Sequence, residues 1–247
     1  EYVLYTAHWD HLGVDPTLVE KGEDGIFNGA IDNATGTAAI LAIAESYKDA
    51  GVRPARSQIF LAVTAEESGL LGAKSFAANP PVPLASIVGG INIDAALPVA
   101  PARDLTVIGY GSSELEDILA EVAEGKGLTL NPDSSPEKGY FYRSDHVEFA
   151  KRGVPMLYVD NGTDLTEGGT EAGRAAEERY TNVLYHKPSD EYDAATWRSD
   201  GLAALTTIMR DVGAELAMTE DFPNWYEGNE FRAIRDAQLE AAGSASE

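Results

Sequence analysis

The sequence contains no cysteine, so it can form neither disulfide bonds nor metal sites with thiolate ligands. Any metal ion that the chain binds must therefore be held by histidine and carboxylate side chains. The absence says little about the cellular compartment, because a protein in an oxidising location does not require cystine.

Basic residues are scarce: 18 Lys and Arg stand against 41 Asp and Glu, which gives a formal net charge of −23 at pH 7. Such a surface repels phosphate backbones and anionic lipid, so we expect no nucleic-acid partner. Long apolar runs are also missing, since none approaches the roughly 18 residues that a membrane-crossing helix needs. We therefore expect no membrane insertion, and no signal peptide is visible.

The chain has 247 residues, 44% of them hydrophobic, which is enough to bury a large core in one domain over residues 1–247. It opens abruptly on an apolar run at residues 2–7, so we expect that the amino-terminal part of a longer precursor is missing. A C-terminal tail over residues 219–247 carries Trp225, Tyr226 and Phe231 and is expected to dock in part. Its last residues, 241–247, are expected to fray.

Short apolar runs alternate with helical stretches, which is typical of an α/β sheet with helices on its faces. Most of the runs are continuously apolar, as expected of strands that are covered on both faces. The predicted strands are residues 2–7, 58–64, 87–93, 105–109 and 154–159.

Three segments have the pattern of helices. Residues 33–48 are rich in alanine and apolar around much of the circumference, which predicts a deeply buried helix. Residues 113–124 carry apolar side chains at helical spacing, and Ser113 with Glu116 predicts a capping box. A third amphipathic helix runs from Leu202 to Leu216. Two long segments, residues 12–29 and 161–185, show no regular pattern and are expected to be irregular loops.

Side chains that can bind a metal follow three of the predicted strands. The first strand ends at His8, the second is followed by Glu66 and Glu67, and the third by Asp94. Ligands of open α/β sheets bind at the carboxyl edge of the strands, and carboxylates buried there without partners are costly. Three such ends meeting at one edge therefore indicate a bound cation.

Taken singly, each of these residues has an ordinary structural interpretation. His8 could be a core histidine, and Asp32 could be the N-cap of the helix that follows it. Glu66 and Glu67 could complement a helix dipole. Asp94 could form a turn at the end of its strand. The prediction of a metal site depends on the whole set.

The set resembles the M28 family of zinc aminopeptidases, and the resemblance covers nearly the whole chain. It implies a three-layer α/β/α fold with a mixed, mostly parallel central sheet, and a peptidase catalytic domain over residues 1–247. The motifs that carry it, in order, are His8-Trp9-Asp10-His11, Gly29-Ala30-Ile31-Asp32-Asn33-Ala34-Thr35-Gly36, Ala65-Glu66-Glu67-Ser68-Gly69, Ile91-Asn92-Ile93-Asp94, Ser144-Asp145-His146 and His186-Lys187-Pro188-Ser189-Asp190.

The resemblance implies two zinc ions that share one carboxylate, each with two further ligands. The shared ligand would be Asp32, one ion would add His8 and Asp94, and the other would add Glu67 and His186. Glu66 would be the general base that takes a proton from a metal-bridging water. Asp10 would orient the His8 ring.

Other positions near these motifs are weaker candidates. The family often places a tyrosine oxyanion donor near residues 140–143, and here Tyr142 or Tyr140 could fill that role because position 141 is phenylalanine. Arg143 could contact the substrate or pair with a surface acid. Residues expected to support the loop or brace the pocket wall, rather than to bind metal, are His11, Asp145 and His146.

The function implied by the resemblance is hydrolysis of the amino-terminal residue from peptides that have a free N-terminus. The alternatives on the same fold are carboxypeptidase or dipeptidase activity and glutaminyl cyclisation; a non-catalytic binding module is a further alternative. Cyclases of this fold use one zinc, whereas this sequence keeps every ligand of the pair. The family also implies an extracytoplasmic location, either periplasmic or secreted.

Overall fold

A six-stranded sheet forms the centre of the computed structural model, which describes residues 1–51 and 53–244. The strand order is β4-β1-β5-β8-β6-β7. In that order the strands are β4 (Ser57–Val63), β1 (Tyr2–His8), β5 (Ile87–Asn92), β8 (Met156–Asn161), β6 (Asp104–Val107) and β7 (Thr129–Pro132).

Strand direction makes the sheet mixed but mostly parallel. β1 pairs in parallel with both β4 and β5, β5 with β8, and β6 with β7, while β6 and β8 are antiparallel. In the β1–β4 register, His8 lies opposite Val63. The residues that follow β1, β4 and β5 therefore leave the sheet at one edge.

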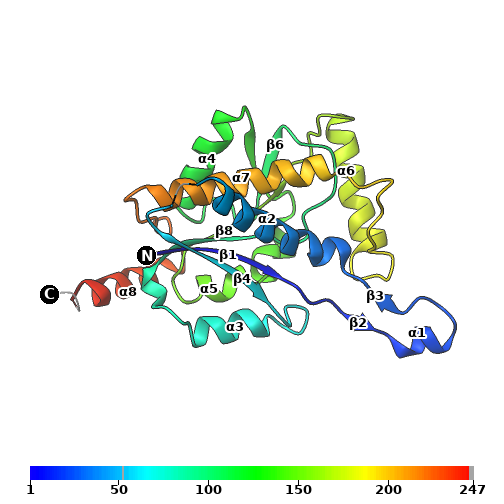
Figure 1. Cartoon of the computed structure of the whole chain (residues 1–247), viewed down its shortest axis with the longest axis horizontal. Helices are drawn as coiled ribbons and strands as arrows, with labels where there is room; N and C mark the ends of the chain where they lie inside the picture. Colours follow the sequence, from blue (N-terminus) through cyan, green and yellow to red (C-terminus); the bar gives the residue numbers. More distant parts are fainter. Residues whose placement is uncertain (52, 245–247) are drawn as a thin grey trace.

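Helices cover both faces of this sheet (Figure 1). On one side lie α2 (Thr35–Asp49), α4 (Leu115–Gly125) and α7 (Ser199–Met218). On the other lie α3 (Leu71–Ala78), α5 (His146–Ala150) and α8 (Arg232–Ser244). The three-layer α/β/α architecture expected from the sequence is therefore confirmed.

The core is split by the sheet because side chains alternate across a strand. Val3 and Tyr5 of β1 point into a cluster with α2, α4 and α7, whereas Leu4 points into a cluster with α3 and α5. Trp225 from the C-terminal segment is fully buried in the second cluster, and its indole Nε1 donates a hydrogen bond to the Gly153 carbonyl at 3.0 Å.

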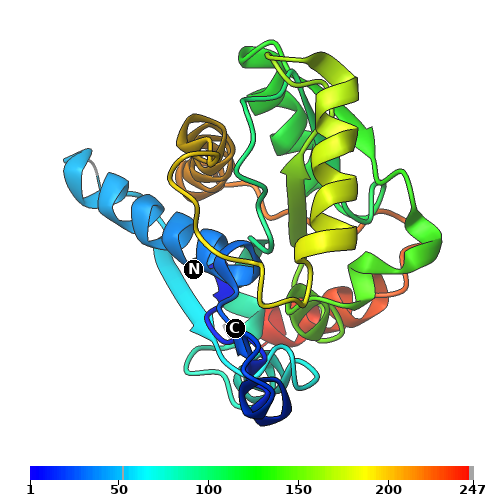
Figure 2. The ribbon, with the colours of Figure 1, turned by 90° about the vertical axis from the view of Figure 1, so that its right-hand side faces the viewer.

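Several short elements gather at the carboxyl edge of β1, which faces the viewer in Figure 2. An arm made of β2 (Gly13–Val14), α1 (Pro16–Glu20) and β3 (Ile26–Phe27) projects on one side, and α6 (Gly169–Arg179) stands on the other. The remaining turns are a kinked segment, Ala30–Ala34, whose backbone is not helical at Asp32 and Asn33, a π-helical segment, Tyr180–Leu184, and the 3-10 segments Leu84–Ser86, Pro136–Lys138 and Tyr140–Tyr142.

Helix α6 corrects the expectation that residues 161–185 lack regular structure. Only Gly173 of this helix is buried, so its sequence lacks the apolar stripe that predicts a helix.

The capping box expected at Ser113, at the start of α4, is half formed. The Glu116 carboxylate accepts from the Ser113 backbone N–H at 3.3 Å, but no side chain caps the helix start.

The tail docks more completely than the sequence indicated. Besides Trp225, Phe231 and Arg235 are buried, and α8 continues to Ser244. Residues 241–244, expected to fray, are therefore helical, while 245–247 lie outside the described residues. Among the described helices, none is both long enough and apolar enough to span a bilayer.

Candidate functional site

His8, Asp32 and Asp94 form a first group of metal-capable side chains. His8 is the last residue of β1, and Asp94 lies two residues beyond the end of β5. The His8 Nε2 atom is 3.1 Å from Asp94 Oδ1 and 3.2 Å from Asp32 Oδ1. Their ligand atoms lie within 4.8 Å of one another, so one cation could contact all three.

Asp32 also faces a second group on its other oxygen. The His186 Nε2 atom is 3.4 Å from Asp32 Oδ2 and 3.1 Å from Glu67 Oε2. The structure thus brings together all five residues that the sequence nominated as ligands, with Asp32 between the two histidines.

His11 lies closer to this second group than the sequence suggested. Its Nδ1 atom is 2.7 Å from Glu67 Oε1, and His11, Asp32 and Glu67 form a second set within 4.8 Å. Neither His11 nitrogen has a hydrogen bond in the described part of the chain, and neither does Glu67 Oε1. His11 and His186 are therefore both within reach of a cation held by Asp32 and Glu67.

The backbone around Asp32 is fixed by a carboxylate that sequence reasoning did not single out. Asp190 is fully buried and accepts from the backbone N–H groups of Ile31 and Asp32 at 2.9–3.1 Å. It belongs to the motif that begins at His186, which was the available signal. Because Asp190 anchors the Asp32 loop from the His186 segment, it fixes the two ligand segments relative to each other.

Asn33 and Ser144 hold the other side of the first group. The Asn33 amide donates to the Ile93 carbonyl at 3.0 Å, and its oxygen accepts from the Ala95 N–H at 3.1 Å. The Ser144 hydroxyl donates to Asp94 Oδ2 at 2.6 Å. Oδ1 of Asp94 is thereby left facing His8. Both supporting residues lie inside the quoted motifs, but nothing in their sequence spacing shows which bonds they make.

Three residues next to the site adopt left-handed backbone conformations. Ala65 precedes Glu66, Ala95 follows Asp94, and His186 is itself a candidate ligand; their φ angles are 57°, 52° and 56°. Residues other than glycine adopt this region at a cost in free energy, and such strain gathers at functional sites.

Asp10 supports both His8 and Glu66. The His8 Nδ1 atom is 3.1 Å from the Asp10 backbone carbonyl and 3.8 Å from its Oδ1. Since a carbonyl can only accept, Nδ1 carries the proton and Nε2 faces the carboxylates. The expected orienting role thus comes from the Asp10 backbone, while its carboxylate accepts from the Glu66 N–H at 3.2 Å.

Charges in the site favour a cation. Burial lowers the pKa of His8, but the hydrogen bonds that its ring donates to the Asp32 and Asp94 carboxylates outweigh this effect and raise that pKa to about 12. Burial raises the pKa of Glu66 to about 8, assisted by repulsion from Asp94. The Glu66 carboxylate makes no hydrogen bond or ion pair within the described residues, so it is free to exchange a proton.

A cavity of about 630 Å³ opens onto this site, and Asp32, Glu66, Asp94 and His186 line it. Arg143, proposed from the sequence to contact substrate, also lines it and lies 3.3 Å from the hydroxyl of Tyr185. The cavity is therefore the place where a substrate would meet the candidate ligands.

The structure does not support Tyr142 as an oxyanion donor. Its side chain is exposed, its hydroxyl donates to Glu230 at 2.7 Å, and it lines a separate hollow of about 190 Å³. Tyr140, the other sequence candidate, does line the large cavity, as does Tyr185. Tyr185 stacks on His186 with 3.9 Å between ring centroids, a contact that the sequence did not reveal.

Asp145 and His146, expected from the sequence to brace the pocket wall, do not themselves line the cavity. Both are buried, and the His146 ring packs against Phe141 and Tyr158 with centroids 4.7 Å and 5.2 Å apart. Burial raises the pKa of Asp145 to about 7 and lowers that of His146 to about 3.

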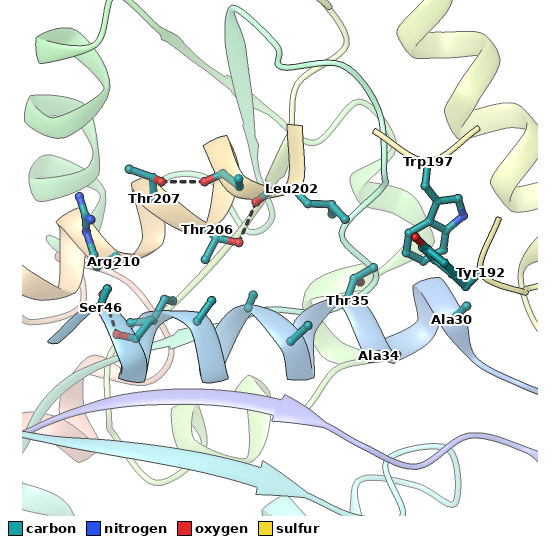
Figure 3. A pocket seen from close by; sticks show the side chains of 15 residues that line it. Ala30, Ala34, Thr35, Ser46, Tyr192, Trp197, Leu202, Thr206, Thr207 and Arg210 are labelled. Carbon is teal, nitrogen blue, oxygen red and sulfur yellow. Dashed lines mark hydrogen bonds between the residues drawn. The ribbon is translucent and has the colours of Figure 1, made fainter. Parts of the chain in front are cut away.

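A second hollow of about 570 Å³ lies elsewhere, between α2 and α7 (Figure 3). Alanines of α2 form much of one wall, and Leu202, Thr206 and Thr207 of α7 form the opposite one. The hydroxyls of Thr206 and Thr207 donate hydrogen bonds to backbone carbonyls of their own helix. This hollow holds no carboxylate or histidine, so we assign the chemistry to the first cavity.

Comparison with known proteins identifies the family of this chain. The model of peptidase family M28 matches residues 1–210. The chain belongs to peptidase family M28. Among its relatives is the leupeptin-inactivating enzyme 1 of Streptomyces exfoliatus, which is 26% identical over 232 residues; the match covers 89% of this chain and 51% of that enzyme.

Solved structures of two aminopeptidases and a glutaminyl cyclase share the fold. LapA aminopeptidase of Legionella pneumophila superposes with a TM-score of 0.65 at 18% identity, covering 89% of this chain and 52% of that one. The aminopeptidase of Aneurinibacillus sp. strain AM-1 gives a TM-score of 0.62 at 18% identity, covering 90% and 45%. A glutaminyl cyclase of Bacteroides thetaiotaomicron gives 0.57 at 17% identity, covering 89% and 73%. The chain spans about half the length of the leupeptin-inactivating enzyme and of the two aminopeptidases.

Proposed function

We propose that this M28 chain is the catalytic part of a two-zinc aminopeptidase, which removes the amino-terminal residue from peptides. The observation that carries the proposal is the position of Asp32, whose two oxygens face His8 and His186 on opposite sides. A carboxylate placed between two histidines, each of which also faces another acid, is suited to bridging two cations.

The donor set fits zinc. It consists of imidazole nitrogens and carboxylate oxygens, which zinc accepts at catalytic sites. His8 Nε2 faces two carboxylates, while Glu67 Oε1 and both His11 nitrogens are shielded from solvent, and the 2.7 Å contact between Glu67 Oε1 and His11 Nδ1 lacks hydrogen-bond geometry. Buried polar atoms of this kind need partners, and a cation would satisfy them. When bound, zinc would lower the pKa of a coordinated water and polarise the peptide carbonyl.

In the proposed two-zinc site, Glu66 would act as the general base. It lines the cavity beside Asp32 and Asp94, and no hydrogen bond within the described residues occupies its carboxylate. It would accept a proton during attack and return it to the leaving amine. Glu67, the next residue, points its oxygens at His11 and His186 instead. The adjacent pair thus divides ligation from proton transfer.

The test combines metal analysis with a panel of substrates. We expect close to two zinc ions per purified chain, cleavage of aminoacyl chromogenic amides, and no cleavage once the amine is acetylated. Cleavage at the carboxyl end would show a carboxypeptidase, and cyclisation of N-terminal glutamine with one zinc would show a cyclase. A folded protein with neither metal nor hydrolysis would be a binding module. An extracytoplasmic location remains a prediction from the family alone.

A further inference from the structure

The cavity extends beyond the candidate ligands. From Asp32 and Asp94 it continues along β6 and β8 to Asp160, with Glu177 of α6 on its far wall. Asp160 and Tyr158 both belong to β8 and are two residues apart, so their side chains point to the same face of the strand. We call the part of this cavity that Ile108, Tyr158, Asp160 and Glu177 line the recess.

Asp160 has no partner in this recess. Its Oδ1 atom is shielded from solvent and makes no hydrogen bond, and no ion pair reaches its carboxylate in the described part of the chain. The Asp160 side chain as a whole is partly buried, and a polar atom shielded from water without a partner is costly. Asp104, a buried acid that also lines the cavity, is by contrast satisfied by Asn131 at 2.8 Å and by the Asp164 N–H at 2.9 Å.

The charges around Asp160 are mostly of its own sign. Burial raises the pKa of Asp160 well above its usual range, and repulsion from Asp94, Glu177 and Asp133 adds to the effect. Three basic residues, Lys138, Arg143 and Arg174, also line the cavity, and all three are exposed. None of them forms an ion pair with these acids among the described residues. A cationic group bound beside Asp160 would offset the repulsion and favour the charged form of its carboxyl group.

We propose that this recess is the subsite for the side chain of the amino-terminal residue, and that it selects a cationic side chain, lysine or arginine. This proposal rests on the aminopeptidase function proposed above. Tyr158 and Ile108 would contact the aliphatic stem of such a side chain, which packs well on apolar groups, while its charged end meets Asp160. A leucine side chain would instead leave the carboxylate buried and unpaired.

The parent enzyme tests the proposal directly. We expect kcat/KM for the 4-nitroanilides of arginine and lysine to exceed that of the leucine compound by about ten-fold or more, because leucine cannot pair with Asp160. The alanine compound is the reference that does not reach the recess. Leucine cleaved faster than both basic compounds would overturn the proposal.

Variants then identify the residue responsible. Asp160→Asn keeps the shape and removes the charge, so kcat/KM for the basic compounds should fall about 30-fold or more, while the alanine compound stays within about three-fold. Glu177→Gln should give a smaller loss of the same pattern. The control is Glu178→Gln, an exposed acid on the same helix that does not line the cavity. An equal loss for every substrate in Asp160→Asn would show a merely structural role.

Binding separates this proposal from the proposed function. L-argininamide and L-leucinamide are titrated calorimetrically into the zinc-loaded parent and into Asp160→Asn. Selective binding of argininamide that depends on Asp160 would support the subsite, whether or not any nitroanilide is cleaved. If none were cleaved, the proposed aminopeptidase function would be wrong while the proposed subsite would stand. Equal affinity of parent and variant for argininamide would overturn the subsite whatever the activity.

Discussion

Glu66 is the residue at which the proposed proton transfer can be tested separately from metal binding. Glu66→Gln removes the proton acceptor but leaves the candidate ligands in place, so we expect kcat to fall by about 10²–10⁴-fold with unchanged zinc content. Steady-state kinetics and metal analysis of the same preparation give both readouts. Glu23→Gln, the same change at an exposed position on the arm, is the control. A Glu66→Gln enzyme that works nearly as fast as its parent would remove Glu66 from this role.

His146 should make the protein sensitive to acid. Its folded pKa, lowered by burial to about 3, lies below the value near 6.5 expected in the unfolded chain. Protonation therefore favours unfolding, and this loss of stability begins as the pH falls below about 6.5 and continues towards 3. Between pH 7 and pH 4 the contribution is about 3 kcal/mol.

The measurement compares denaturant unfolding of the parent and His146→Asn at several pH values. Effects of acid on the metal site are common to both proteins, so the difference between their unfolding free energies isolates His146. That difference should shrink by about 3 kcal/mol as the pH falls from 7 to 4. A difference that stays constant with pH would mean that His146 already carries its proton at pH 7, or never takes one up on unfolding.

Among individual residues, the sequence indicated which side chains come together around Asp32 but not how each of them contacts its neighbours. The other four nominated ligands lie around Asp32, because each follows a strand or falls in a motif that the sequence displays. The proximity of His11 to Glu67 and the turn of Tyr142 towards Glu230 depend on loop conformation instead. Loop conformation is set by tertiary contacts, and hydrophobic periodicity carries no information about it.

Among the elements, α7 shows how closely a helix approaches the sheet. Gly213 faces β1, and a Cβ added there would overlap the hydroxyl of Tyr5. Tyr5 cannot move aside easily, because it is fully buried, stacks on Phe60 at 5.1 Å and lies 3.1 Å from the Tyr47 hydroxyl. We expect Gly213→Ala to lower the free energy of unfolding by about 1–3 kcal/mol.

The matched control for this change is Gly125→Ala at the end of α4. An added Cβ meets no atom within 4 Å there, so the substitution should be neutral or slightly stabilising. Chemical denaturation of both variants gives the comparison. Equal stability of the two would show that α7 can shift away from the sheet without loss.

The elements that the sequence predicted are those with a clear apolar pattern. β1, β4 and β5 were placed to within a residue or so at each end because their runs are continuously apolar. Helix α6 and strand β7 were not predicted: α6 buries only Gly173, and β7 has no buried residue. Such elements are stabilised by neighbours that are distant in sequence, which a local pattern does not show.

For the whole molecule, the proposed metals should contribute to stability as well as to chemistry. Asp32, Glu67 and Asp94 lie within reach of the proposed cations in a chain of net charge −23, so losing the cations would remove positive charge that offsets these carboxylates. A ligand that binds only the folded state stabilises it by mass action. We therefore expect a strong chelator to lower the melting temperature by about 10 °C.

Adding back zinc should restore the original melting temperature, whereas calcium should not, because calcium prefers an all-oxygen set and this site presents imidazoles. Asp32→Ala loses the oxygens that face both histidines, so its melting temperature should not respond to chelator or to zinc. The comparison is made by calorimetry at constant salt, since screening of the net charge also affects stability. If the parent protein melted at the same temperature with and without chelator, its fold would not depend on metal. Protonation would then have to neutralise the carboxylates at the Asp32 site instead.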